Sequence, residues 1–149
     1  MSYLSKQAVP PKLALFKLTS DTAWVNDQTL PLSLVTDYNL ISQNHCSLSN
    51  NIITLNTGFY FFEFKGAGSR AASTAISLNI KKDNVIYSDG ENYTKASYDA
   101  LTDVKRTVKT AGLLKESVNG SNQFTLVSTG TSASTTLFSN YTYLLIWRV

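Results

Sequence analysis

His45 and Cys46 are the only histidine and the only cysteine in this sequence, and together they could form a catalytic pair. A thiolate next to an imidazole can attack a carbonyl carbon, provided that the two side chains lie within hydrogen-bond reach. Adjacent residues of an extended chain point to opposite faces, which keeps the imidazole away from the thiol. One histidine and one cysteine also cannot supply the ligands of a zinc site within one chain. We therefore predict that Cys46 packs as a small apolar side chain. A threefold axis could bring together three copies of His45 to bind a metal.

Other candidate chemistry is weaker. Four carboxylates fall in the polar stretch 88–103: Asp89, Glu91, Asp99 and Asp103. Such oxygens bind calcium when a loop gathers them around one ion, whereas scattered carboxylates are typical of a solvated loop. The GAGSR segment at 66–70 lacks the lysine and strand-to-helix context of a phosphate loop. The sequence thus predicts no enzyme, no catalytic residue, no cofactor and no resident metal, with calcium in 88–103 as an open alternative.

The composition excludes several classes of partner. Only 15% of the residues are charged, against about 25% in typical soluble proteins, and the net charge is +3. Nucleic-acid-binding proteins concentrate their positive charge more than this chain does, so we predict no nucleic-acid partner. No apolar run is long enough to span a membrane or to serve as a signal peptide. A single cysteine excludes an intrachain disulfide, and we expect synthesis in a cytoplasm.

The elements that position these residues are predicted to be β-strands. Apolar alternation without helical periodicity, and turn signals at 83–84 and 119–120, indicate roughly eight to ten short strands in a β-sandwich. We expect one domain over 12–149, preceded by an extended arm over 1–11 that ends in paired prolines. The predicted strands cover 12–18, 38–41, 52–55, 58–65, 74–81, 85–87, 104–118, 122–128 and 141–149, with shorter strands within 19–36. Residues 66–73 are predicted as a loop or as the irregular start of the next strand, and residues 88–103 and 128–136 as loops or connections.

Three of these strands are apolar on both faces: 12–18, 58–65 and 141–149. In the central one, Tyr60, Phe62 and Phe64 share one face, and Phe59 and Phe61 share the other. A monomeric sandwich buries only one face of a sheet, so the second apolar face needs a cover. The simplest cover is another copy of the chain, and the alternative is a terminal segment or loop of the same chain.

The central strand resembles a motif of the C1q-like and tumour-necrosis-factor-like jelly-roll proteins. The signature Gly-x-Tyr-x-Phe-x-aromatic is complete at Gly58, Tyr60, Phe62 and Phe64. The sequence Phe-Ser-Asn-Tyr at 138–141 is similar to a second motif near the end of those chains. The resemblance implies a jelly roll that assembles into homotrimers, in which the sheet containing the first, central and last strands faces the threefold axis.

The resemblance and the strand periodicity select the same three strands for the interface between copies. The predicted trimer interface consists of Leu13, Leu15, Phe59, Phe61, Tyr143, Leu145 and Trp147. Residues 144 and 146 are also apolar, so the pattern leaves open which face of the last strand meets the axis. Tyr93 and Tyr98, in the predicted loop 88–103, are candidate contact residues for a partner, because tyrosine offers a large contact area. Alternatively, they fold back onto the rim of the sandwich.

The resemblance also suggests a role. Stand-alone members of this fold without a secretion signal or a collagen-like repeat resemble bacteriophage virion proteins, and this chain begins at Met1 with neither feature. We expect a structural virion protein: a trimeric capsid decoration (cement) protein, made in the host cytoplasm and bound to the major capsid protein on the outside of the head. The alternative is the receptor-binding head of a fibre or spike that recognises a host glycan or protein. Residues 1–11 are short for a shaft, which favours decoration.

Overall fold

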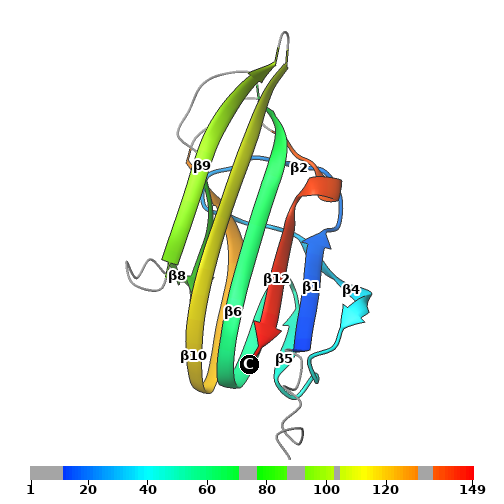
Figure 1. Ribbon diagram of the computed structural model, residues 1–149, viewed down its shortest axis with the longest axis vertical. Coiled ribbons are helices and arrows are strands. Elements are labelled where there is room, and N and C mark those ends of the chain that lie inside the picture. The colour runs from blue at the N-terminus through cyan, green and yellow to red at the C-terminus, as the bar shows by residue number, and fades with distance from the viewer. Residues whose placement is uncertain (1–11, 71–76, 87–92, 103–104, 131–135) are drawn as a thin grey trace, which may run out of the picture.

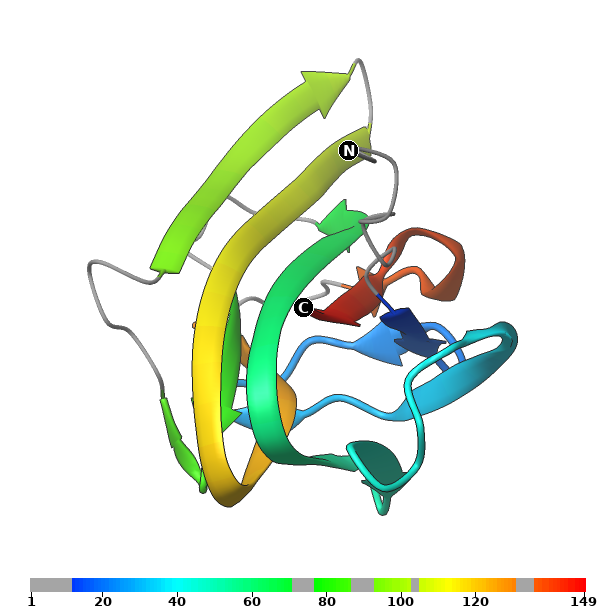
Figure 2. The same ribbon diagram turned by 60° about the horizontal axis from the view of Figure 1, so that its bottom comes forward.

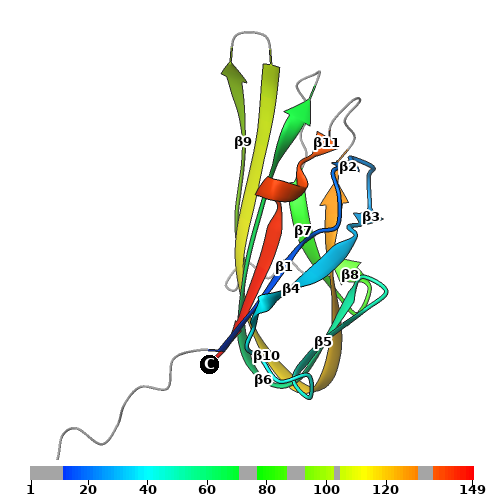
Figure 3. The same cartoon turned by 90° about the vertical axis from the view of Figure 1, so that its right-hand side faces the viewer.

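The protein folds as a two-layered β-sandwich in which all paired strands are antiparallel (Figure 3). The computed structural model describes residues 12–70, 77–86, 93–102, 105–130 and 136–149. The layer that faces the reader in Figure 1 contains the long strands β4 (Leu32–Asn39), β1 (Lys12–Leu18), β12 (Tyr143–Arg148), β6 (Ile52–Arg70), β10 (Lys105–Thr129) and β9 (Tyr93–Thr102). We call this layer the front sheet.

The second layer is built from short strands and from the far halves of β6 and β10. Its short strands are β3 (Gln28–Thr29), β5 (Cys46–Ser49), β7 (Ser77–Lys82) and β8 (Val85–Ile86). Two further short strands, β2 (Thr22–Ala23) and β11 (Thr136–Leu137), pair with each other, and β11 also pairs with the end of β6. A one-turn 3₁₀ helix, η1 (Ser139–Tyr141), leads into β12.

Strands β6 and β10 form a long ribbon that bends from one layer into the other, as Figure 2 shows from below. Their pairing runs from Arg106↔Arg70 to Val118↔Gly58 and resumes at Ser121↔Asn56, which leaves one extra residue in β10. Gly120 lies in this β-bulge with a φ of 89°, a conformation that glycine adopts without steric cost. The hairpin predicted at 119–120 is therefore wrong. The glycine does mark a change of direction, but both arms of β10 keep β6 as their partner.

The observed extent of β6 in this ribbon corrects two other predicted strand boundaries. The segments 52–55 and 58–65, predicted as separate strands, form one strand that also includes the glycine-containing segment 66–70, predicted as a loop. In β6, Gly68 pairs with Leu137 of β11 at a close approach of the two backbones. Glycine within this strand thus marks a place where another strand comes near, and not the end of the strand.

The core lies between the layers and consists of the inward-facing residues of each strand. The alternation predicted for the strands at 12–18 and 58–65 is confirmed, because their core-facing residues are almost completely buried: Ala14, Phe16 and Leu18, and Tyr60, Phe62 and Phe64. The rings of Phe62 and Phe124 meet edge to face at a centroid distance of 5.0 Å and join the two layers. Burial of each such side chain contributes about 1.5–3 kcal/mol, so the core is the main source of stability.

Strand β9 corrects the largest loop prediction. Residues 93–102 form a strand that pairs with β10 along its whole length, from Tyr93↔Leu114 to Thr102↔Lys105. Tyr93 and Tyr98, predicted in a loop, therefore occupy strand positions. Strand formation depends on a neighbouring strand more than on a clean alternation of side chains, which this segment lacks. Residues 87–92 and 103–104 lie outside the described residues.

The remaining boundaries shift by a few residues. Strand β12 begins at Tyr143 and not at 141. Asn79 of β7 is buried and donates a hydrogen bond to Thr129 Oγ1. The predicted strand at 38–41 lies instead at 32–39. The turn at Asp83 and Asn84 is confirmed by their φ angles of 48° and 68°. The predicted arm 1–11 and residues 74–76 lie outside the described residues.

Candidate functional site

The candidate functional site is the outer face of the front sheet. Paired residues of neighbouring antiparallel strands project from the same face of a sheet, so the register identifies its members. One row across the sheet contains Leu13, Trp147, Phe61 and Lys115. The next contains Leu15, Leu145 and Glu63, and the third contains Lys17, Tyr143 and Lys65. We call these residues, with Phe59 and Ser117 at the lower end, the outer face.

All seven residues of the predicted interface lie on this outer face. The register also shows which side of the last strand faces outward. Leu144 and Ile146 are 1% and 0% exposed and face the core, so Tyr143, Leu145 and Trp147 face outward. The structure thus places the apolar second faces of β1, β6 and β12 side by side, which the sequence could only assume.

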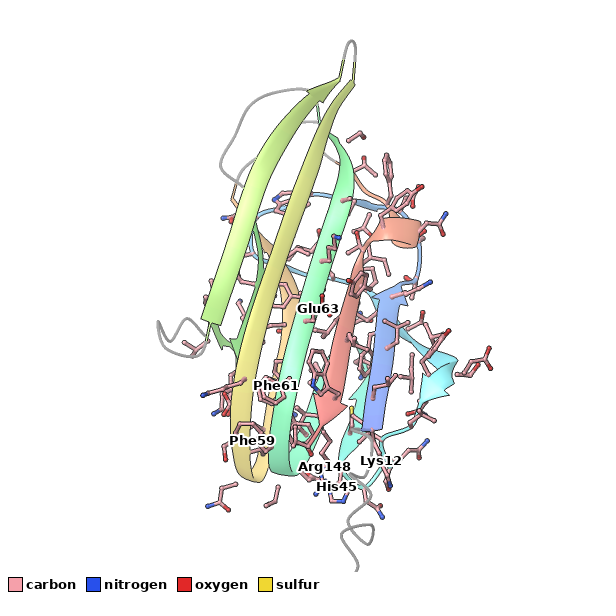
Figure 4. The ribbon with its side chains drawn as sticks, in the orientation of Figure 1. Lys12, His45, Phe59, Phe61, Glu63 and Arg148 are labelled. Atoms are coloured by element: carbon pink, nitrogen blue, oxygen red, sulfur yellow. The ribbon has the colours of Figure 1, made fainter. Side chains whose placement is uncertain are left out.

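An aromatic cluster occupies the lower part of the outer face (Figure 4). The rings of Phe61 and Trp147 stack at a centroid distance of 5.7 Å with an interplanar angle of 23°. The ring of Phe59 meets Phe61 edge to face at 5.4 Å and remains 38% exposed. These contacts hold the rings in place within one chain, and each is worth about 0.5–1.5 kcal/mol beyond its buried area. The cluster is therefore a preformed apolar surface.

Charged groups lie above and beside this cluster. Glu63 is half-buried in the middle row. Partial burial of the Tyr143 phenol raises the pKa of that group, and the negative charge of Glu63 raises it further. Lys17, Lys65 and Lys115 are exposed. Among the residues whose side chains are described, none forms an ion pair with Glu63. The outer face thus combines an apolar centre with unpaired charges of both signs.

The signature glycine has a local role that the sequence did not reveal. A Cβ on Gly58 would lie 2.8 Å from Nε of Arg148 and 3.1 Å from the Tyr60 ring. The Tyr60 hydroxyl donates a hydrogen bond to the Asn56 carbonyl at 2.7 Å, and burial raises the pKa of that phenol. Gly58 therefore leaves room for Arg148, the last residue of β12. This packing fixes the end of β12 against β6, and hence the outer face. The sequence did contain a signal for this packing. In an alternating strand, Arg148 projects from the same side as the core residues 144 and 146, and so toward the side on which Gly58 lies.

Cys46 and His45 do not form a catalytic pair. Burial raises the pKa of the Cys46 thiol to about 12, so the nucleophilic thiolate is almost absent near neutral pH. The backbone of His45 continues the pairing of β5 with β6 beyond Cys46, since its carbonyl accepts a hydrogen bond from the amide of Asn56. Among the residues described here, no three histidines, cysteines or carboxylates lie close enough to hold a metal ion. In the same part of the chain, no helix is long and apolar enough to cross a membrane.

Comparison with known proteins identifies the fold. No protein family and no curated protein matches the sequence. Among solved structures, murine APRIL superposes with a TM-score of 0.56 at 10% identity, covering 93% of this chain and 99% of that one. Eiger TNF from S. frugiperda superposes with a TM-score of 0.57 at 12% identity, covering 95% of this chain and 94% of that one. The predicted fold class is therefore confirmed: this chain is an all-β jelly roll of the tumour-necrosis-factor type.

Proposed function

We propose that the protein is a non-enzymatic structural protein of a bacteriophage virion. It acts as a homotrimer that decorates the outer surface of the head and stabilises it by binding the major capsid protein. The single observation that carries this proposal is the outer face, a partly exposed and preformed apolar surface on a jelly roll. A surface of this kind serves contact between proteins.

The occupant of the outer face is a second copy of the same chain. Contiguous, partly exposed aromatic rings favour burial in a protein contact, where Trp, Tyr and Phe carry much of the binding energy. The face also carries charges of both signs at different places, with Glu63 in one row and the lysines in the rows beside it. This arrangement suits contact between one part of the face and a different part of the face of the next copy. Head-to-tail contacts of this kind close into a ring when the rotation allows it, and three copies form the smallest such ring beyond a dimer.

The decoration role follows from what a trimer of this kind can do. It presents each capsid-binding surface three times, so three modest contacts combine into strong attachment through a high effective concentration. The protein needs no oxidising compartment, because its one cysteine is buried as a free thiol. A rigid sandwich placed across neighbouring capsid subunits adds contacts that oppose their separation under internal pressure. This assigns the protein to the exterior of the capsid after synthesis in the host cytoplasm.

One observation favours a second function, the receptor-binding head of a fibre or spike. Strands β9 and β10 extend past the end of the sandwich, as Figures 1 and 3 show. In a trimer, the projecting ends of β9 and β10 from the three copies would form a tip that could touch a host glycan or protein. Tyr93 and Tyr98, the candidate contact residues, lie on β9, but Tyr93 pairs with Leu114 at the end of β9 away from this tip.

Images of the virion separate the two functions. Virions shown by mass spectrometry to contain this chain are imaged by electron cryomicroscopy with the chain intact and after its release by mild denaturant. We expect a threefold-symmetric density on the shell that disappears on release. Density confined to a tail or spike tip would support the receptor-binding head instead. Virions that never contain the chain would contradict both functions.

A further inference from the structure

We infer that Glu63 forms an ion pair with a lysine of the neighbouring copy and thereby sets how two copies align. This inference rests on the proposed self-assembly and adds the residues that determine its register. The partner lysine is one of Lys17, Lys65 and Lys115, the three lysines on the same face.

The first observation is the position of Glu63. It lies on β6 between Phe61 and Lys65 in the outward series, opposite Leu145 of β12, with Leu15 next in the row. Its surroundings within the chain are therefore largely apolar, and Figure 4 shows it at the centre of the sheet. A carboxylate in such a place is tolerated while water reaches it, but it becomes strongly unfavourable when a contact removes the water without supplying a partner.

The second observation is that no ion-pair partner of Glu63 is found among the described side chains. There the ion pairs join Lys81 to Asp27 and Lys82 to Glu116, and both lie away from the outer face. Glu63 does not take part in either pair. A lysine of a neighbouring copy can supply the partner that these side chains do not.

The third observation is the arrangement of the lysines. Lys17 and Lys65 flank Tyr143 in the row above Glu63, and Lys115 lies at the end of the row below it. All three are exposed, and none forms an ion pair within the described side chains. When a second copy is shifted along this face, one of its lysines therefore lies opposite the carboxylate of Glu63 in only a few alignments. At every other position an apolar row covers the charge, which disfavours those alignments.

The inference is tested by charge reversal in the full chain. Glu63→Lys is expected to weaken trimer association at least tenfold in sedimentation equilibrium, because it brings like charges together across each interface. One of Lys17→Glu, Lys65→Glu and Lys115→Glu should weaken it similarly. Combining that change with Glu63→Lys should restore association to within about threefold of wild type, which a merely structural role would not produce.

Asp27→Asn serves as the control, because it removes one negative charge from an exposed residue away from the outer face and should leave association unchanged. Three results would overturn the inference: normal association of Glu63→Lys, weakened association that none of the three reversals restores, and dissociation of the wild-type trimer by EDTA, which would assign Glu63 to a metal ion. None of these three results contradicts the proposal that the wild-type chain forms a trimer. Only a monomeric wild-type chain removes the proposed self-assembly.

Discussion

Phe61→Asp is expected to abolish the trimer and to leave a soluble monomer or an aggregate. Phe61 lies at the centre of the aromatic cluster, stacked on Trp147 and in contact with Phe59. An aspartate there removes the ring from the cluster and brings a carboxylate into each of the interfaces between copies, with only the exposed Lys115 opposite it. Loss of the ring and desolvation of the charge together cost several kcal/mol, on the order of the whole contribution of a good contact residue. Sedimentation velocity at micromolar concentration measures the outcome.

Val85→Asp is the matched control for this substitution. Val85 is 69% exposed on the short strand β8 of the other layer, so the same change in side-chain chemistry falls outside the outer face. The control should remain trimeric, and circular dichroism should show both variants folded. If the Phe61→Asp protein sediments like wild type, Phe61 does not lie in the interface.

Gly68→Ala is expected to destabilise the fold by about 3 kcal/mol, the upper end of the usual range for overpacking. A Cβ on Gly68 would lie 1.8 Å from the carbonyl oxygen of Thr136 and 2.9 Å from Cα of Leu137. Both atoms belong to backbone, which cannot rotate away as a side chain can. The pairing of β11 with β6 must therefore open, and the buried Leu137 loses its place in the core. Urea unfolding gives the free energy directly.

Gly66→Ala provides the comparison on the same strand. Its Cβ would meet the end of the Leu78 side chain at 2.7 Å, and a side chain can shift to another rotamer. We expect a loss of about 1 kcal/mol, the lower end of the range for overpacking. Equal stability of the two variants would show that β11 does not approach Gly68 as closely as described.

The sequence predicted the parts of the fold that depend on local pattern. Alternation within 12–18 and 58–65 identified the core-facing residues correctly, because a half-buried strand imposes a period of two on its sequence. The turn at 83–84 was also correct, since its residues tolerate positive φ. These features depend on residues next to one another in the chain.

The ribbon of β6 and β10 could not be predicted in this way. Its strands pair residues far apart in the sequence, such as Phe61 with Lys115, and hydrogen bonds between them carry no local signature. Strand β9 exists because β10 offers it an edge, and the bulge at Gly120 resembles a hairpin signal when read locally. Long-range pairing therefore explains both the missed strand and the wrong turn.

The candidate site was predicted in composition but not in arrangement. The surplus of aromatic residues at 59 and 61 showed that a second apolar face exists. The register then showed that Tyr143, Leu145 and Trp147 share that face, which parity alone could not decide, because both sides of β12 are apolar. Glu63 was missed because a single charge in a strand normally indicates a solvated position. Its significance follows only from the apolar residues of its own row, Leu145 and Leu15, and from the aromatic row below it.

Sedimentation velocity of the unmodified protein tests the central claim most directly. The chain has a mass of 16.4 kDa, and at micromolar concentration we expect one species with three times that mass, unchanged by reducing agent because Cys46 is buried. Such a species would place the outer face between copies of the chain. A stable monomer under the same conditions would contradict this account, because the aromatic cluster would then remain exposed or be covered from within the chain.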